Sequence, residues 1–475
     1  MALTSGTYFV FLIAVFFVYW LIADRARWRI VFLVLAGCFF YSQAGWRGLI
    51  LLASLTVMDF TTTRLMGRFE SARMRRLLLT FSLASNIGVL CVFKYANFFI
   101  ETAASSLSLF GLEVAIGQLS LAAPLGISFL VFQSLAYVID VYRRDTEPAR
   151  SYTEYLAFIS FFPTIVAGPI LRAKQLLPQL RNRVYLDPAT GGQALFLIAV
   201  GLIKKIAVAD YLSANLVDRV FDFPERFSSL EVLAAVYGYA FQIYADFSGY
   251  SDIAIGSALL LGLRLPANFD APYRSRSLTE FWRRWHISLS TWLRDYLFFT
   301  VVGKRVRSAA ALYFGLVITM LVGGLWHGPT WTFVLWGALH GMGLVAARWF
   351  MTLRKRFPVL QINAPVSDAA GLVLTFHFVC FAWIFFRADS LDSALAILTQ
   401  LAGLTIDASN IALPVLFVIA LAVAAHSLPA SLSDKAQKGF SRLPSPVQAS
   451  VLFALALGLY MVASSDVVPF IYSRF

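Results

Sequence analysis

The chain has 475 residues, of which 59% are apolar and 14% charged. Soluble domains carry roughly 25% charged residues, so this composition excludes a water-soluble globule. The 43 Phe, 19 Tyr and 11 Trp residues also exclude a disordered or fibrous chain. The class that remains is a polytopic helical membrane protein, all-α in fold. Its formal net charge of +13 is expected in cytoplasmic loops, and we expect no nucleic-acid partner.

Apolar runs of about 20 residues, the length that crosses a bilayer core of about 30 Å, alternate with basic loops along the chain. The first run is followed by Arg25, Arg27 and Arg29, whereas residues 1–6 hold no Lys or Arg. The positive-inside rule therefore places the N-terminus in the periplasm or outside, and continued alternation places the C-terminus there too. About twelve spans are predicted: 7–23, 29–44, 48–63, 77–99, 122–141, 192–213, 230–261, 309–326, 331–349, 370–387, 411–428 and 447–465.

Three further segments are not counted as spans, and the first of them breaks the alternation. Residues 154–170 have basic flanks at both ends and contain Pro163 and Gly168-Pro169, so they predict a re-entrant hairpin beside a cavity. Residues 264–307 carry nine Lys or Arg and are expected on the cytoplasmic side. Residues 391–404 repeat apolar side chains at helical spacing and predict an interfacial helix. The whole chain, 1–475, is expected to form one membrane domain, with N-terminal helices (1–150), a catalytic core (151–350) and C-terminal helices (351–475).

Polar side chains inside apolar runs are costly in a membrane, so each one is a functional candidate. The run from Gln242 contains Asp246, Ser248, Tyr250 and Asp252. Two interpretations are equally open for this run. It is either a hydrogen-bonded joint between helices or part of the wall of a reaction chamber.

A second polar cluster extends from residue 268 to residue 288. Ser277 is a plausible helix N-cap, and Glu280 three residues later predicts a capping box. A helix at the membrane surface accounts for the arginines and the aromatic residues, yet it does not require His286. The other candidate substrate-binding residues of this cluster are Asn268, Tyr273, Arg283, Arg284 and Trp285.

A third cluster contains Trp326 and His327, followed by His340. Histidine titrates near neutral pH, and a histidine general base contributes roughly 10²–10⁴ in rate. Of the five histidines, His377 and His426 are expected to be structural, and for His340 a structural role is favoured. The single cysteines Cys38, Cys91 and Cys380 form no pair with zinc-type spacing, so neither a disulfide nor a metal site is expected.

At these clusters the sequence resembles the membrane-bound O-acyltransferase superfamily, and within it the bacterial alginate O-acetyltransferase branch. The combination of residues 281–290, Phe-Trp-Arg-Arg-Trp-His-Ile-Ser-Leu-Ser, with Trp326-His327-Gly328 is specific to it. Weaker matches follow in family order at 124–129, 168–169, 201–205, 242–256, 268–296 and 469–472. The resemblance implies that His327 is the principal catalytic residue of a membrane-spanning tunnel. His286 matches the family's second polar position, which is Asn in many eukaryotic relatives.

The resemblance further implies that acetyl groups from cytoplasmic acetyl-CoA cross the bacterial inner membrane. A periplasmic partner of the SGNH-hydrolase type would then acetylate an extracellular or periplasmic polysaccharide of the alginate or cellulose type. Besides membrane lipids, a polysaccharide synthase or export complex is an expected partner, and no permanently bound cofactor is expected. For Arg283 and Arg284, contact with phospholipid headgroups is at least as plausible as binding of CoA phosphates.

Two other functions fit the composition. A transporter or flippase for a polysaccharide precursor would also have about twelve spans, and Asp246 and Asp252 could relay protons. No inverted repeat supports that interpretation. A structural scaffold for an envelope polysaccharide synthase is the third alternative, and retained acetylation without His286 and His327 would favour it.

Overall fold

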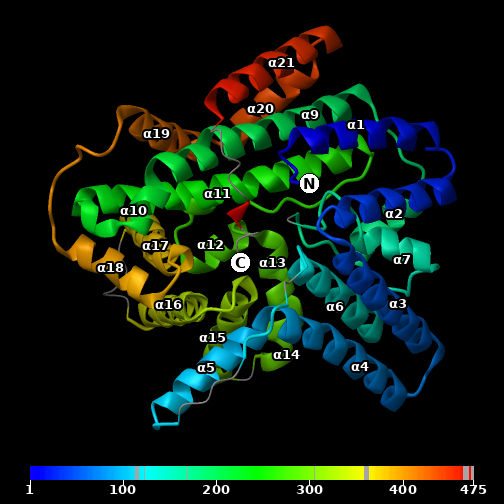
Figure 1. Ribbon diagram of the computed structural model, residues 1–475, viewed down its shortest axis with the longest axis horizontal. Coiled ribbons are helices and arrows are strands. Elements are labelled where there is room, and N and C mark those ends of the chain that lie inside the picture. Colours follow the sequence, from blue (N-terminus) through cyan, green and yellow to red (C-terminus); the bar gives the residue numbers. More distant parts are fainter. Residues whose placement is uncertain are drawn as a thin grey trace. The chain divides into compact units, whose positions relative to one another are not determined.

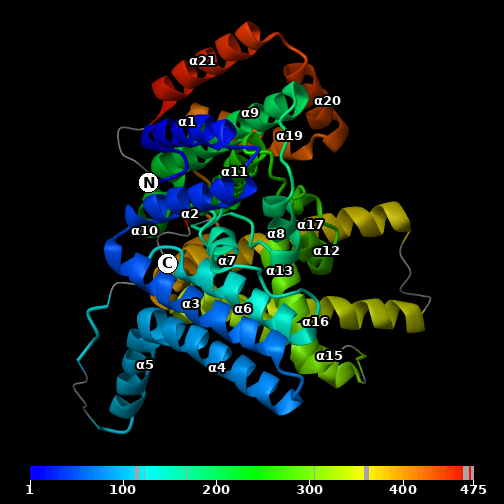
Figure 2. The ribbon, with the colours of Figure 1, turned by 90° about the vertical axis from the view of Figure 1, so that its right-hand side faces the viewer.

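A computed structural model describes residues 1–112, 117–121, 124–166, 168–303, 305–306, 308–357, 363–463 and 470–471. All regular elements of these residues are helices (Figures 1 and 2), which confirms the all-α fold. The residues divide into two compact units. Unit 1 comprises 1–186 and 257–266, and unit 2 comprises 187–256 and 267–475.

Unit 1 contains eight helices and the last turn of a ninth among its described residues. They are α1 (Gly6–Leu21), α2 (Ala26–Ser42), α3 (Trp46–Arg68), α4 (Ala72–Leu90), α5 (Ala96–Ser108), α6 (Ile127–Arg143), α7 (Tyr152–Ile159) and α8 (Ala173–Arg181). Helices α3, α4 and α6 lie side by side (Figures 1 and 2). A π-helical turn, Cys91–Tyr95, joins α4 to α5.

A buried carboxylate connects α3 to α4 in unit 1. Oδ1 of Asp59 accepts hydrogen bonds from Ser82 Oγ at 2.5 Å and from Asn86 Nδ2 at 3.1 Å. All three side chains are completely buried. Because an unsatisfied polar group is costly in an apolar surrounding, these bonds fix the register of the two helices.

Unit 2 contains the longer C-terminal part of the chain. Its helices are α9 (Pro188–Leu202), α10 (Asp218–Asp222), α11 (Ser229–Leu260, of which the last turn belongs to unit 1), α12 (Leu278–Arg284), α13 (Ile287–Trp292), α14 (Phe299–Val302), α15 (Ala309–His327), α16 (Trp331–Arg356), α17 (Ala364–Arg387), α18 (Leu391–Ala402), α19 (Leu413–Ser427), α20 (Ala430–Ser441) and α21 (Ser445–Val462). Shorter π-helical stretches follow α9 at Ile203–Asp210 and α13 at Leu293–Phe298.

Two helix pairs of unit 2 pack backbone to backbone through glycine. A Cβ atom at Gly249 of α11 would lie 2.7 Å from the carbonyl oxygen of Gly201 on α9. A Cβ atom at Gly337 of α16 would meet the carbonyl oxygen of Met320 on α15. Small residues let helix backbones approach closely, which is the usual basis of helix association in membranes.

Among the described residues, six helical segments are long and apolar enough to cross a membrane: Trp46–Arg68, Ala72–Ser108, Ala309–His327, Trp331–Arg356, Pro365–Arg387 and Ser445–Val462. Helices α19 and α20, bent by 94° at their junction, make a seventh if they count as one span. These segments confirm a polytopic membrane protein. The count of about twelve spans stays a prediction.

Several predicted segments can be compared in detail with the structure. Residues 154–159 of the segment 154–170 belong to α7, an eight-residue helix, which at about 12 Å is too short to cross a bilayer core. The re-entrant hairpin stays a prediction. The interfacial segment forms α18, whose N-cap Ser390 accepts a hydrogen bond from the Ser393 backbone. Helix α20 was not predicted, because its sequence has no continuous apolar run.

Candidate active site

His327 is the last residue of α15 and lies in an aromatic pocket. Its ring centroid lies 5.0 Å from Trp326, 5.1 Å from Trp336 and 5.0 Å from Phe386. The side chain is buried. The imidazole therefore lies at the carboxyl end of a helix in surroundings of low polarity, where its interactions with other charges are weakly screened.

Glycines on both sides of His327 explain why the chain can place it there. A Cβ atom at Gly324 would meet the carbonyl oxygen of Phe333, and one at Gly328 would meet the Phe333 ring. Gly328 is extended and ends α15. The glycines in the sequence 323–328 thus let α15 and α16 close tightly around the histidine.

His286 occupies a short connection between α12 and α13, with φ = 41° and ψ = 57°. This left-handed conformation is uncommon for a residue with a side chain, and such strained backbone is concentrated at functional sites. The side chain is completely buried. Burial lowers the pKa of His286 to about 3, so its imidazole is neutral at physiological pH.

Asn268 holds the ring of His286 in place. Its Oδ1 lies 3.2 Å from His286 Nδ1 and accepts hydrogen bonds from the Ser288 backbone at 3.2 Å and from Ser288 Oγ at 2.9 Å. Its Nδ2 donates to Ser251 Oγ of α11 at 3.2 Å. Because a backbone N–H can only donate, the amide orientation is fixed. Nδ1 of His286 therefore carries the hydrogen, and Nε2 keeps its lone pair.

Trp326 contacts both histidines. Its ring centroid lies 6.1 Å from that of His286 and 5.0 Å from that of His327. The two predicted catalytic histidines, separated by 41 positions in the sequence, thus contact the same indole ring inside unit 2. Trp326 is itself buried, so the three rings form one enclosed cluster.

Asp246 on α11 forms an ion pair with Lys205. The Nζ atom of Lys205 lies 2.7 Å from Asp246 Oδ1 and 2.6 Å from Asp210 Oδ1. Lys205 and Asp210 both belong to the π-helical stretch Ile203–Asp210, whose hydrogen bonds span five residues and bring positions five apart onto one face. A lysine held between two carboxylates stabilises all three charges in a mostly buried place.

Asp252, six residues after Asp246 on α11, forms an ion pair with Lys204. The Nζ atom of Lys204 lies 2.6 Å from Asp252 Oδ2. Ser248 and Tyr250 are buried on the same helix. The carboxylates of the predicted cluster thus connect α11 to the stretch after α9, as in a joint between helices. Their role in substrate binding stays a prediction.

The chain's C-terminal end contacts the same part of α11. The backbone N–H of Ile471 donates to Asp246 Oδ2 at 2.8 Å, and the Phe470 ring centroid lies 4.0 Å from that of Tyr250. Phe470 and Ile471 are both buried. Phe247 lies 5.8 Å from Phe470 and 4.6 Å from His286. Of the terminal motif 469–472, Pro469 and Tyr472 lie outside the described residues.

Tyr273 and Trp285 belong to an aromatic core beside the histidine cluster. Tyr273 Oη donates to the Ala240 carbonyl at 2.6 Å and accepts from Trp383 Nε1 at 3.2 Å. Trp285 stacks on Phe281 with ring centroids 5.6 Å apart. These contacts fix the aromatic core on which the His286 connection rests.

The two neighbouring arginines predicted at the site differ in their contacts. Arg284 forms ion pairs with Glu280 at 3.0 Å and with Asp270 at 3.3 Å. Arg283 lines a cavity of about 620 Å³ instead. Ser277 caps α12 as predicted, accepting from the Glu280 backbone. The capping box is incomplete, however, because the Glu280 carboxylate accepts from the backbone of Arg276 rather than from that of Ser277.

The remaining histidines have the following surroundings. His426 Nε2 accepts a hydrogen bond from the Tyr273 backbone at 3.1 Å. His377 is exposed, and its Nδ1 donates to the Val373 carbonyl at 2.8 Å. His340 is completely buried among aromatic rings, with Trp336 at 4.8 Å and Trp282 at 5.1 Å. These contacts agree with structural roles for His377 and His426.

Lys205 and Asp210 were not predicted as part of the polar cluster. Lys205 appeared in the sequence only as part of a family match at 201–205, and Asp210 carried no motif. The usable signal was the presence of charged residues of both signs in two predicted spans, among them Lys204, Lys205, Asp210, Asp246 and Asp252. Charges of opposite sign inside membrane helices are expected to pair with one another.

Comparison with known proteins agrees with this geometry. A family model described as the membrane-bound O-acyltransferase family matches residues 146–388. A probable alginate O-acetylase of Azotobacter vinelandii is 40% identical over 399 residues, which cover 82% of this chain and 76% of the relative. A peptidoglycan O-acetyltransferase of Helicobacter pylori is 34% identical over 402 residues, which cover 79% of this chain and 74% of the relative.

A more distant relative widens the chemistry of the group. A teichoic acid D-alanyltransferase of Streptococcus thermophilus is 30% identical over 296 residues, covering 57% of this chain and 69% of the relative. All three relatives are named as transferases of acyl groups. The chain belongs to the membrane-bound O-acyltransferase family and is an integral membrane O-acyltransferase.

Proposed function

We propose that this protein transfers acetyl groups from cytoplasmic acetyl-CoA across the inner membrane for O-acetylation of an alginate-type extracellular polysaccharide. The observation that carries the proposal is the enclosed cluster in which Trp326 contacts both His286 and His327. It occurs in a chain that shares 40% of its residues with a probable alginate O-acetylase over 399 positions. The relative's name supplies the acetyl group and the polymer class.

His327 acts as the general base. Its imidazole takes the proton from an acceptor hydroxyl as the hydroxyl oxygen attacks the carbonyl carbon of the acetyl thioester. The new C–O bond forms, the C–S bond breaks, and the thiolate leaves with the proton returned by His327. The aromatic rings around His327 exclude water, which would otherwise compete with the acceptor for the acetyl group.

His286 positions the reactants. Asn268 fixes its Nδ1–H, so Nε2 is the acceptor nitrogen of the ring, and in this proposal it accepts a hydrogen bond from the hydroxyl or the thiol. Its low pKa keeps His286 neutral at physiological pH, so it acts as a hydrogen-bonding group and not as a cation. A neutral polar residue at this position agrees with the family resemblance, in which many eukaryotic relatives carry asparagine there.

In this proposal the protein resides in the bacterial inner membrane with both termini in the periplasm. The basic loops support that orientation, since they are expected on the cytoplasmic side. The acetyl group passes to a periplasmic partner of the SGNH-hydrolase type, beside a polysaccharide synthase or export complex. These partners rest on the resemblance to the alginate O-acetyltransferase branch.

The test uses purified full-length protein in proteoliposomes with acetyl-CoA labelled in its acetyl group and an alginate oligosaccharide as the acceptor. Because a general base contributes roughly 10²–10⁴ in rate, His327→Ala is expected to lower the release of free CoA by about that factor. His377→Ala is the matched control, since His377 is exposed and its hydrogen bond goes to Val373 of its own helix. Wild-type consumption of acetyl-CoA by His327→Ala would overturn the assignment.

The acceptor is tested separately in cells that lack the gene. Polymer acetyl content is measured for extracellular polysaccharide and for peptidoglycan, with wild-type and His327→Ala protein restored. Loss and restoration of acetyl groups on the extracellular polysaccharide is the expected result. Loss confined to peptidoglycan would replace the polysaccharide with the acceptor named for the Helicobacter relative.

A further inference from the structure

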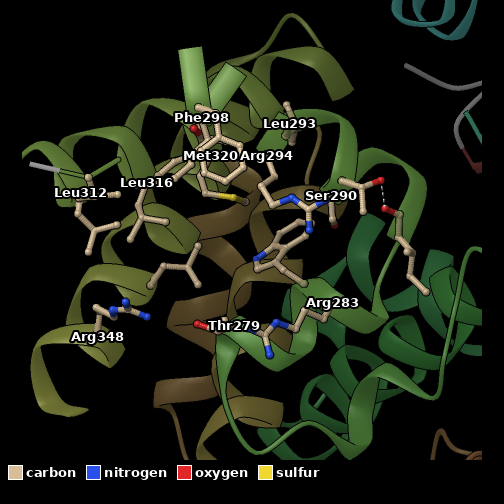
Figure 3. A pocket seen from close by; sticks show the side chains of 17 residues that line it. Thr279, Arg283, Ser290, Leu293, Arg294, Phe298, Leu312, Leu316, Met320 and Arg348 are labelled. Atoms are coloured by element: carbon tan, nitrogen blue, oxygen red, sulfur yellow. Dashed lines mark hydrogen bonds between the residues drawn. The ribbon is translucent and has the colours of Figure 1, made fainter. Parts of the chain in front are cut away.

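The cavity that Arg283 lines is built by the elements from α12 to α16 (Figure 3). Its volume is about 620 Å³, a size that holds a drug-sized molecule or a lipid segment. The walls are mostly apolar and include Trp282, Leu293, Phe298 and Met320. Neither His286 nor His327 is among the lining residues, so the cavity is separate from the histidine cluster.

The cavity lining combines buried apolar side chains with exposed arginines. Leu293, Met320 and Leu344 are less than a tenth exposed, whereas the side chains of Arg283, Arg294 and Arg348 are exposed. Figure 3 shows that these arginines reach the cavity from three different directions. They come from α12, the π-helical stretch Leu293–Phe298 and α16. A ligand that matches this lining has an anionic group and an apolar body.

The charges of the rim are incompletely balanced by protein groups. Arg294 forms an ion pair with Asp295 at 2.8 Å. Among the described residues, no ion pair involves Arg283 or Arg348. The adjacent Arg284, by contrast, forms ion pairs with two carboxylates. A rim of three cations beside one carboxylate attracts an anion, and guanidinium groups suit phosphate because they donate in a fork.

We propose that this cavity binds a phosphate-bearing amphiphile. The phosphate lies against the rim of Arg283, Arg294 and Arg348, and the apolar part extends toward Leu293, Met320 and Leu344. Two sources supply this chemistry. One is an anionic phospholipid of the surrounding bilayer, and the other is the phosphate-bearing carrier of the acyl group. The proposal concerns binding alone and does not depend on the identity of the catalytic residues.

The cavity wall is connected to the histidine cluster through two indole rings. Trp282 lines the cavity, and its ring centroid lies 5.7 Å from that of Trp336. The ring of Trp336 lies 5.1 Å from that of His327. A ligand that displaces Trp282 would therefore act on a neighbour of His327. Occupancy of the cavity is expected to alter the packing of the catalytic site.

The experiment measures binding by native mass spectrometry of the full-length protein in detergent. Phosphatidylglycerol is the anionic lipid probe, phosphatidylcholine is the zwitterionic comparison, and CoA is the soluble phosphate probe. The variant Arg283→Ala/Arg348→Ala is expected to bind the anionic probe at least about tenfold more weakly than wild type. Arg264→Ala/Arg356→Ala is the matched control, because it removes the same charge from exposed arginines that do not line the cavity.

A second variant keeps the test independent of the folding of the first. Leu316→Trp fills the cavity without changing the charge of the rim, and it is expected to reduce binding by a similar factor. Arginine-dependent binding of phosphatidylglycerol would identify a lipid site, and arginine-dependent binding of CoA would identify a donor site. Equal binding of every probe by wild type, both double variants and Leu316→Trp would overturn the proposal, whatever the transfer activity of His327→Ala.

Discussion

The Nζ atom of Lys205 lies 2.7 Å from Oδ1 of Asp246, in a place where both side chains are 3% exposed. Removing one partner of a buried ion pair costs about 3–5 kcal/mol, because the other charge stays buried without compensation. Lys205 also neutralises Asp210. The lysine is therefore the residue on which the whole trio depends.

Lys205→Met is expected to destabilise the protein more than Asp246→Asn. The first change leaves two carboxylates without their shared cation and is expected to lower the free energy of unfolding by about 3–5 kcal/mol. The second leaves Lys205 paired with Asp210, and the asparagine oxygen can still accept from the Ile471 backbone. Thermal unfolding in detergent, monitored by size-exclusion chromatography, shows which of the two variants has the lower melting temperature. A lower melting temperature for Asp246→Asn than for Lys205→Met would contradict this account.

Asn268→Ala is expected to lower the turnover of acetyl transfer by about tenfold or more. Without the Asn268 oxygen, His286 is no longer held in the tautomer that carries its hydrogen on Nδ1. Ser288 Oγ lies 3.4 Å from His286 Nδ1 and cannot replace the amide fully. The Michaelis constant for acetyl-CoA should change little. A rise in that constant with unchanged turnover would assign Asn268 to donor binding instead. Tyr185→Ala, an exposed change in unit 1, is the control.

Much of the architecture was predictable because a membrane constrains sequence strongly. The low charge content and the basic loops predicted a polytopic helical protein, and Ser277 predicted the start of α12. His286 and His327 were recognisable because polar residues are rare in such a chain. That both contact Trp326 was not predicted, since no spacing rule relates positions 41 apart.

The polar contacts of α11 could not be predicted in the same way. Pairing of Lys205 with both Asp210 and Asp246 requires a π-helical stretch and the glycine-mediated contact of α9 with α11. Neither the wider turn nor the helix crossing leaves a periodic signal in a uniformly apolar run. The cavity at Arg283 could not be predicted from the sequence either. Arg283 and Arg284 are adjacent residues of the same type, and only their tertiary contacts distinguish them.

The low pKa of His286 predicts an acid-dependent loss of stability. Histidine in the unfolded chain titrates near 6.5, whereas the folded value is about 3. Between these values the unfolded chain binds a proton that the folded chain does not, so the stabilisation is complete above pH 6.5 and is lost as the pH falls toward 3. At pH 5 the loss is about 2 kcal/mol.

His286→Asn removes this titration while retaining a neutral polar side chain. Between pH 7 and pH 5 the melting temperature of the wild type is expected to fall further than that of the variant. Melting in detergent at both pH values measures the difference. A variant that loses as much stability as wild type over this interval would show that other groups account for the acid sensitivity.

Gly337→Ala tests whether close packing of α15 and α16 positions His327. The added Cβ would meet the Met320 carbonyl oxygen, and it would lie 3.1 Å from the Leu321 Cα atom. Since overpacking costs about 1–3 kcal/mol, the melting temperature should fall, and acetyl transfer should fall with it as α15 shifts. Gly458→Ala is the matched control, because no atom lies within 4 Å of its added Cβ, and alanine stabilises a helix by up to about 1 kcal/mol. Equal melting temperatures for the two variants would mean that the helices can separate without strain, and that the glycine is not required at this position.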